Sequence, residues 1–187
     1  GVIAREENLG GLAVTAVEIS NEEGAHALGK APGKYFSLDL PGHFERGAEG
    51  FSSAVGTLAA LIGRCAPESA DSVLVAALGN PDITPDALGS LAAGSILVTR
   101  HLKKSGSPGF EGFSSLALCR PGVLGTSGIE TASQVSVLCR ELAPALVIAI
   151  DALAGTEADR LGRAVQVSDA GISPGSGVGN DRQELSK

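Results

Sequence analysis

The sequence predicts an α/β protein with a mostly parallel sheet flanked by helices. Two continuous apolar runs, Ser72–Leu78 (SVLVAAL) and Ala145–Ile150 (ALVIAI), indicate strands that are covered on both faces. Apolar residues at helical spacing lie between these runs. Parallel neighbours need a long crossover, and a helix is the compact way to make one. The pattern therefore indicates β-α-β units.

The first third of the chain alternates between predicted strands and helices. Leu12–Ile19 (LAVTAVEI) and Tyr35–Leu40 (YFSLDL) show the period-two alternation of half-buried strands. Ser20–Glu23 fits a capping box, so a short helix is expected to follow it and to end at Gly29. Apolar residues at helical spacing between Gly47 and Cys65 predict a helix that faces the core.

The rest of the chain continues the same pattern. Thr84 and Pro85 supply an N-cap and a first-turn proline, which predicts a helix over 85–98. A second helix is expected over Glu130–Leu142, and Ala164–Ser168 (AVQVS) is expected as a third buried strand. KKSGSPGFEGFSS and GISPGSGVGN are expected to be loops. Neither an internal repeat nor a linker is evident, so we expect a single domain over residues 1–187.

Composition narrows the class of protein. The 187 residues carry a net charge of −7, which disfavours a broad electrostatic grip on nucleic acid. We find no apolar run long enough to span a bilayer and no signal-peptide core, so we expect an intracellular protein. Three widely separated cysteines, Cys65, Cys119 and Cys139, each lie in an apolar neighbourhood, which favours buried thiols over a disulfide or metal framework.

Two aspartates stand close to the ends of the apolar runs. Asp151 follows ALVIAI directly, and Asp86 opens the helix expected after SVLVAAL. Ligands of open α/β sheets lie outside the carboxyl ends of the strands, and a helix that follows a strand begins at that edge. We therefore expect both carboxylates in one cleft. Each also has an ordinary structural explanation, Asp86 at a helix N-terminus and Asp151 as the cap of a turn.

If the two carboxylates share a site, they cannot both ionise easily. The pair then retains one proton and offers a base together with an acid, an arrangement that activates water against a peptide carbonyl. The Asp-Thr-Gly motif of pepsin-like enzymes is absent, so this is a different solution. The glycine-rich segments GVLGTSGIET and GISPGSGVGN offer backbone amides for an oxyanion, although tight turns also explain them.

Other chemistries have weaker support. A nucleophile elbow of the G-x-S-x-G type is absent, and His26, His43 and His101 stand in unrelated contexts without zinc-ligand spacing. His101 is the histidine best placed to reach the cleft, although it equally suits a helix C-terminus. We expect neither a metal nor another cofactor.

Several segments together resemble one known family. LGNPDITPDALG, VTRHL, PGVLGTSGIET, VIAIDALA and VSDAGISPGSGVGN occur in this order, with GLAVTAVEI and GKAPGKYFSLDLPG before them. This arrangement is similar to the germination endopeptidase of spore-forming bacteria, an atypical aspartic-type protease. The resemblance covers nearly the whole chain. It implies a fold similar to that of hydrogenase maturation proteases.

The resemblance also implies a function. Members of that family hydrolyse the small acid-soluble proteins that coat spore DNA, cleaving after a glutamate, during germination. They are made as zymogens with an N-terminal propeptide, and they form homotetramers. These properties imply a protease in the cytoplasm of the spore core, with no direct contact to nucleic acid or membrane. We expect this chain to lack both the propeptide and the family's C-terminal region.

Site residues follow from the matching motifs. The family's catalytic aspartates correspond to Asp86 and Asp151 in this chain. Arg100 or Lys103 is a candidate to receive the substrate glutamate, because a basic side chain complements a carboxylate. Further residues in matching motifs are candidates for substrate binding, Asn80, Arg100, His101, Thr126 and Ser127, with Asp169 beside them.

Two alternative functions stay open at this point. The protein is a silent binding module if the aspartates only cap turns and the acidic edge binds a basic partner. It is a metal-dependent hydrolase if Asp86, Asp151 and His101 hold a divalent ion.

Overall fold

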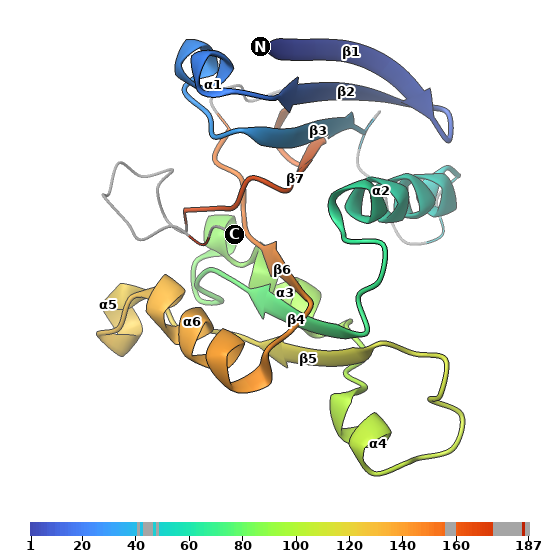
Figure 1. The fold of residues 1–187 in the computed structure, drawn as a ribbon, viewed down its shortest axis with the longest axis vertical. Coiled ribbons are helices and arrows are strands. Elements are labelled where there is room, and N and C mark those ends of the chain that lie inside the picture. The colour runs from blue at the N-terminus through green and yellow to red at the C-terminus, as the bar shows by residue number, and fades with distance from the viewer. Residues whose placement is uncertain (41, 43–46, 48, 156–159, 174–184, 186–187) are drawn as a thin grey trace. The chain divides into compact units, whose positions relative to one another are not determined.

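A computed structural model describes residues 1–40, 42, 47, 49–155, 160–173 and 185 (Figure 1). The chain divides into two compact units, and each is described by itself. We name them the antiparallel unit, Gly1–Ala66 with Gly155–Gly171, and the parallel unit, Pro67–Ala154 with Ile172–Ser186. The α/β class is confirmed, but in place of one mostly parallel sheet the structure has a three-stranded parallel sheet and a four-stranded antiparallel sheet. The single domain over residues 1–187 stays a prediction.

The antiparallel unit contains a four-stranded sheet in the order β1-β2-β3-β7. All neighbours in this sheet run antiparallel. The two predicted alternating strands are confirmed as β2 and β3. The strands are β1 (Val2–Leu9), β2 (Leu12–Ile19), β3 (Gly33–Asp39) and β7 (Ala164–Ser168).

Two strands of this sheet differ from the prediction. β1 carries the charged stretch Arg5–Glu7 and is largely exposed, so it lacks the apolar alternation that identifies a strand in a sequence. β7 is a strand as predicted, but it pairs antiparallel with β3 instead of joining a parallel sheet. Its residues are half-buried or exposed, which suits a sheet with one solvated face and not a strand covered on both sides.

Two helices accompany this sheet. α1 (Glu22–Leu28) begins at Asn21, whose side chain accepts a hydrogen bond from the Gly24 N–H, one residue after the expected cap at Ser20. It ends at Gly29 in the left-handed conformation, as predicted. α2 (Phe51–Cys65) packs its apolar side on the sheet. The core between α2 and the sheet contains the buried residues Leu12, Val14, Ala16, Phe36, Leu38 and Leu61.

The parallel unit contains a three-stranded parallel sheet in the order β5-β4-β6. The two continuous apolar runs form β4 (Ser72–Ala77) and β6 (Leu146–Ile150), as predicted. β5 (Ser115–Cys119) was not predicted, because it is short and follows a long polar loop. A helix, α6 (Thr131–Leu142), covers this sheet, and Val135 of α6 packs in a core with Leu74, Ala76 and Leu78.

The helix expected over 85–98 is wrong in its extent. A short 3₁₀ helix, η1 (Thr84–Asp86), comes first and is followed by α3 (Leu88–Ala93). Glycine disfavours the helix interior, and α3 stops just before Gly94. The connections also contain α4 (Arg100–Lys104) and α5 (Leu124–Ser127). Most of the loop GISPGSGVGN lies outside the described residues.

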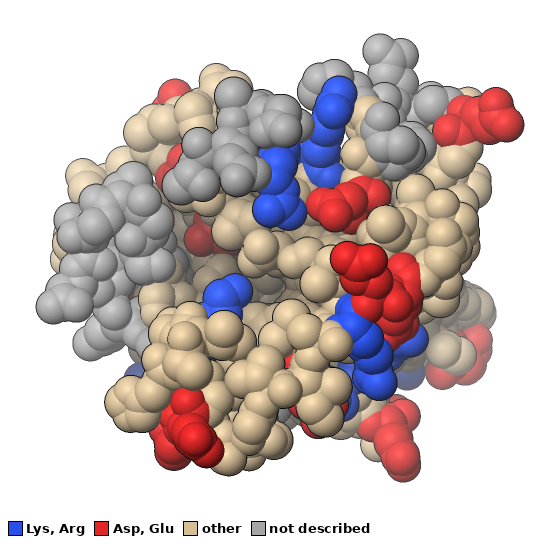
Figure 2. All heavy atoms as spheres, turned by 90° about the horizontal axis from the view of Figure 1, so that it is seen from above, with Lys and Arg blue, Asp and Glu red and all other residues tan. Residues whose placement is uncertain are grey.

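Three further observations concern composition. Cys65, Cys119 and Cys139 are partly buried, and burial raises the pKa values of the Cys119 and Cys139 thiols, which fits unreactive structural roles. Within the part of the chain that the structure describes, we find no helix with the length and apolar character needed to cross a membrane. Among the described residues on the face drawn in Figure 2, basic side chains lie next to acidic ones.

Candidate active site

The carboxyl edge of the parallel sheet brings Asp86 and Asp151 into one region. Asp151 follows the last residue of β6, Ile150. Asp86 ends the η1 turn that comes after β4. The chain just beyond β4 stays beside β6, because the Leu78 N–H donates to the Ile150 carbonyl at 2.8 Å. Both aspartates therefore lie at the edge that the sequence predicts.

Two glycines allow the segment around Asp86 to approach these strand ends closely. A Cβ on Gly89 in α3 would lie 2.3 Å from the Leu78 carbonyl oxygen and 2.5 Å from that of Ile150. Gly79 has a φ of +96°, and a Cβ there would lie 2.0 Å from the Asp86 carbonyl oxygen. Neither approach is open to a residue with a side chain. At this edge, the two glycines thus allow backbone segments to contact each other directly.

Asp86 accepts a hydrogen bond from the turn that follows β4. The Asn80 N–H donates to Asp86 Oδ2 at 2.8 Å. The Asn80 side chain in turn accepts from the Asp82 N–H at 3.0 Å, which fixes the turn after Gly79. The predicted residue Asn80 therefore lies at the site and contacts Asp86 through its backbone.

Asp151 lies in a partly buried environment that changes its pKa. Burial raises the pKa of the Asp151 carboxyl above its ordinary value, the Ala152 N–H at 2.9 Å lowers it, and the negative charge of Asp86 raises it further. The charge of Asp86 is the smallest of these three influences, and it indicates that the two carboxyl groups lie close enough to interact. A carboxyl group with a raised pKa beside a second carboxylate is an arrangement that can supply an acid and a base.

A hollow of about 290 Å³ opens beside this pair. Asn80 and Thr126, both predicted for substrate binding, line it together with Ser90 of α3. Asp86 and Asp151 are not among the lining residues, and Asn80 connects the hollow to Asp86. The hollow is lined by Gly79, Asn80, Pro81, Asp82, Ser90, Arg120, Pro121, Gly122, Val123 and Thr126.

Arg120 was not predicted from the sequence, and it is the only cation among the described residues that line this hollow. It follows Cys119, the last residue of β5, and so stands at the same edge as Asp151. The described residues supply no ion pair or hydrogen bond to its side chain. A polar residue directly after a strand is a sign of a site at the carboxyl edge. Arg120 fits this description, but the sequence does not reveal β5 as a strand.

Arg100, His101 and Lys103 lie at the other edge. Thr99, which precedes α4, bonds through its hydroxyl and N–H to Ser114 and Leu116, at the amino end of β5. The five residues of β5 put this end roughly 13 Å from the carboxyl edge. The Lys103 amine donates to the backbone carbonyls of Glu111 and Phe113. These contacts give Arg100, His101 and Lys103 no place beside the aspartates.

The remaining predicted residues have local roles. Ser127 bonds through its hydroxyl to the backbone of Val123 and Ile129 and shapes the turn after α5. The N–H groups of Thr126, Ser127 and Gly128 donate to carbonyls of the same turn, so these amides are not available to an oxyanion. Asp169 lies in the antiparallel unit, where its carboxylate accepts from the Lys34 N–H at 2.7 Å.

The trio proposed for a metal ion does not come together. Over the described residues, which include Asp86, Asp151 and His101, no three side chains of His, Cys, Asp or Glu form a group suited to a metal. Asp86 and Asp151 interact, but His101 lies toward the amino edge with α4. The two carboxylates alone thus define the candidate site.

Comparison with known proteins decides the family. A family model described as germination protease matches residues 1–187. The chain belongs to the germination protease family. The resemblance found in the sequence motifs is thereby confirmed.

Individual members of the family show the same relationship. A germination protease from Caldanaerobacter subterraneus subsp. tengcongensis is 43% identical over 187 residues, which cover 99% of this chain and 58% of the relative. One from Geobacillus sp. (strain WCH70) is 40% identical and covers 100% of this chain and 51% of the relative. One from Clostridium perfringens is 42% identical, with coverages of 100% and 58%. The chain spans between half and three-fifths of these relatives.

Proposed function

We propose that the protein is an endopeptidase of aspartic type that uses Asp86 and Asp151 to activate water. One observation carries this proposal: two carboxyl groups come together at the carboxyl edge of a parallel sheet, and burial raises the pKa of one of them, Asp151. Membership of a protease family supports the choice of a peptide bond as the substrate.

The two environments assign the roles. Asp86, held by the Asn80 N–H, acts as the base and takes a proton from the attacking water. Asp151, whose pKa is raised by burial, acts as the acid and donates a proton to the substrate carbonyl oxygen as the tetrahedral intermediate forms. Asp86 then delivers its proton to the leaving amine, and Asp151 recovers one as the carbonyl re-forms. No covalent intermediate or metal is needed in this scheme.

The hollow beside the pair provides a place for the substrate. We assign the recognition of an acidic substrate side chain to Arg120, because this residue lines the hollow and a guanidinium can bind a carboxylate in a bidentate manner. This assignment replaces Arg100 and Lys103, which lie at the amino edge.

The finer properties of the family belong to the same proposal. We infer that the substrates are small acid-soluble spore proteins and that the protein acts in the cytoplasm of the spore core during germination. We further propose assembly as a homotetramer, synthesis as a zymogen, and the fold of hydrogenase maturation proteases. Membership of the germination protease family supports each of these inferences.

A cleavage assay tests the proposal. The protein is incubated with a purified small acid-soluble spore protein, and products are identified by mass spectrometry. The wild type is expected to cleave after glutamate, whereas Asp86→Asn and Asp151→Asn are expected to retain their fold and to lose cleavage. Loss of the fold in both variants would favour purely structural aspartates.

The same assay separates the alternatives. A silent binding module would bind the spore protein and leave it intact in every variant. A metal-dependent hydrolase would lose activity on treatment with a chelator, whereas an aspartate pair would not.

A further inference from the structure

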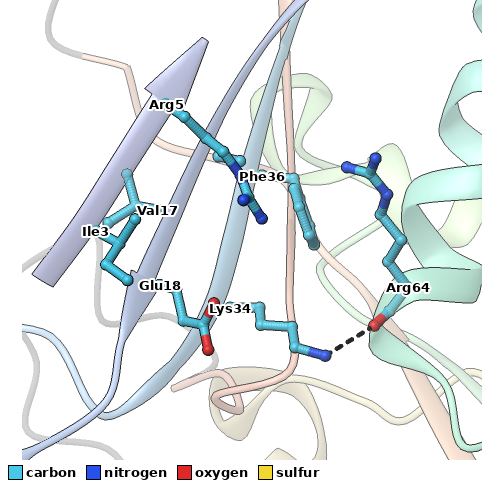
Figure 3. A pocket seen from close by; sticks show the side chains of 8 residues that line it. Ile3, Arg5, Val17, Glu18, Lys34, Phe36 and Arg64 are labelled. Carbon is cyan, nitrogen blue, oxygen red and sulfur yellow. Dashed lines mark hydrogen bonds between the residues drawn. The ribbon is translucent and has the colours of Figure 1, made fainter. Parts of the chain in front are cut away.

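A second hollow lies on the sheet of the antiparallel unit and also has a volume of about 290 Å³ (Figure 3). No residue of the proposed catalytic scheme takes part in it. Its lining combines apolar and charged side chains, Ile3, Arg5, Ala16, Val17, Glu18, Lys34, Phe36 and Arg64.

Strand register explains why the sheet is hollow here. Arg5 of β1 lies opposite Ala16 of β2, which lies opposite Phe36 of β3. The small Ala16 therefore separates two long side chains in one row across the sheet. The row beside it consists of Ile3, Glu18 and Lys34. Ala16 and Phe36 are buried, so they form an apolar floor.

Three cationic side chains from three elements surround this floor. Arg5 comes from β1, Lys34 from β3 and Arg64 from the last turn of α2. Figure 3 shows their charged ends around the Phe36 ring. The Arg64 guanidinium lies 5.4 Å from the centre of that ring, and the Lys34 amine donates to the Arg64 carbonyl at 3.4 Å. These contacts hold the cations in place.

The acidic neighbours do not neutralise all of this charge. Glu7 binds both guanidinium groups, that of Arg64 at 2.8 Å and that of Arg5 at 3.2 Å. Among the described residues, Glu18 is the only carboxylate that lines the hollow itself. Counted over the same described residues, two carboxylates thus face three cations and leave an excess positive charge, in a chain whose net charge is −7. Glu7 also orients the two guanidinium groups and leaves further N–H donors on each.

We propose that this hollow binds a peptide segment that presents one carboxylate beside an apolar side chain. The cations receive the carboxylate, and the floor of Ala16 and Phe36 receives the apolar group. The excess charge suits a single negative charge, whereas a phosphate dianion would be repelled by Glu7 and Glu18. The volume lies near the lower end of that of small-molecule sites, so it fits one or two side chains.

Matched small probes test this chemistry. N-acetyl-leucine carries a carboxylate and an apolar side chain, and N-acetyl-leucinamide differs only in lacking the charge. In NMR titrations, N-acetyl-leucine is expected to shift the backbone amide signals of Ala16 and Phe36, and the amide is expected to bind at least about tenfold more weakly. Equal binding of the two probes, or stronger binding of inorganic phosphate, would overturn the proposal.

Variants locate the site. Arg5→Gln is expected to weaken binding of N-acetyl-leucine about tenfold, because Arg5 is exposed and its loss should spare the fold. Lys30→Gln is the matched control, since Lys30 lies over Tyr35 in the same unit and does not line the hollow. An equal loss in the control would show unspecific charge attraction and overturn the site. This test needs no cleavage, so its outcome is independent of the proposed protease activity.

Discussion

The two edges of the parallel sheet carry polar residues with different tasks. At the carboxyl edge, Asp86 and Asp151 interact beside a hollow, and Arg120 has no partner among the described side chains. At the amino edge, the side chains of Thr99 and Lys103 form hydrogen bonds with the backbone of neighbouring segments. Polar groups bound to their own backbone hold the fold, whereas unpartnered groups at a hollow are free for a ligand. Strand direction thus separates a candidate active site from a structural edge.

The largest expected difference between the edges is in catalysis. Asp151→Asn is expected to lower kcat/KM for the spore protein by at least about 100-fold, because it removes the proton donor. His101→Gln, at the amino edge, is expected to change kcat/KM by less than about threefold, which is small against the effect of one catalytic group. Steady-state kinetics on both variants check this contrast. A comparable loss in His101→Gln would place the active site elsewhere.

The next effect concerns the close packing that holds the carboxyl edge together. Gly89→Ala is expected to destabilise the protein by about 1–3 kcal/mol and to reduce cleavage, because the new methyl group meets the backbone of Leu78 and Ile150. Gly125→Ala is the control, since a Cβ there finds no atom within 4 Å. Urea unfolding measures both variants. Equal stability of the two would show that the edge adjusts without cost.

A smaller effect is expected for recognition. Arg120→Gln is expected to raise KM about tenfold for peptides with an acidic side chain before the cleaved bond, and to leave other peptides unchanged. Lys103→Gln, which removes a cation at the amino edge, is expected to leave KM unchanged for both peptides. An unaltered KM in Arg120→Gln would mean that the substrate carboxylate binds elsewhere.

The sequence allowed the carboxyl edge to be predicted better than the rest of the site. Asp86 and Asp151 could be placed because β4 and β6 are continuous apolar runs, and a run shows where its strand ends. Arg120 was missed because β5 has five partly buried residues after a polar loop and gives no such signal. A site residue at this edge could therefore be predicted only where the end of its strand could be recognised in the sequence.

Strand partners were harder to predict than strands. β7 was recognised from its composition, but pairing with β3 depends on contacts between residues more than a hundred positions apart, and no local pattern records them. The charged edge strand β1 shows the same limit, because solvent on its outer side removes the apolar alternation. Arg100 and His101 were included from matching motifs, which carry no information about the edge on which a residue lies.

The smallest expected effect tests whether the two carboxylates influence each other. Burial raises the pKa of Asp151, so the native state holds this proton more tightly than the unfolded chain does. The stabilisation from this group is therefore complete below the ordinary pKa of 3.8 and is lost as pH rises through the native pKa. Relative to the wild type, the melting temperature of Asp151→Asn should increase between about pH 4 and about pH 7. When the same comparison is made in an Asp86→Asn background, the increase should be smaller but still present, because burial, the larger cause, remains. An identical increase in the two backgrounds would mean that Asp86 does not act on Asp151, and the acid-base pair would lose its physical basis.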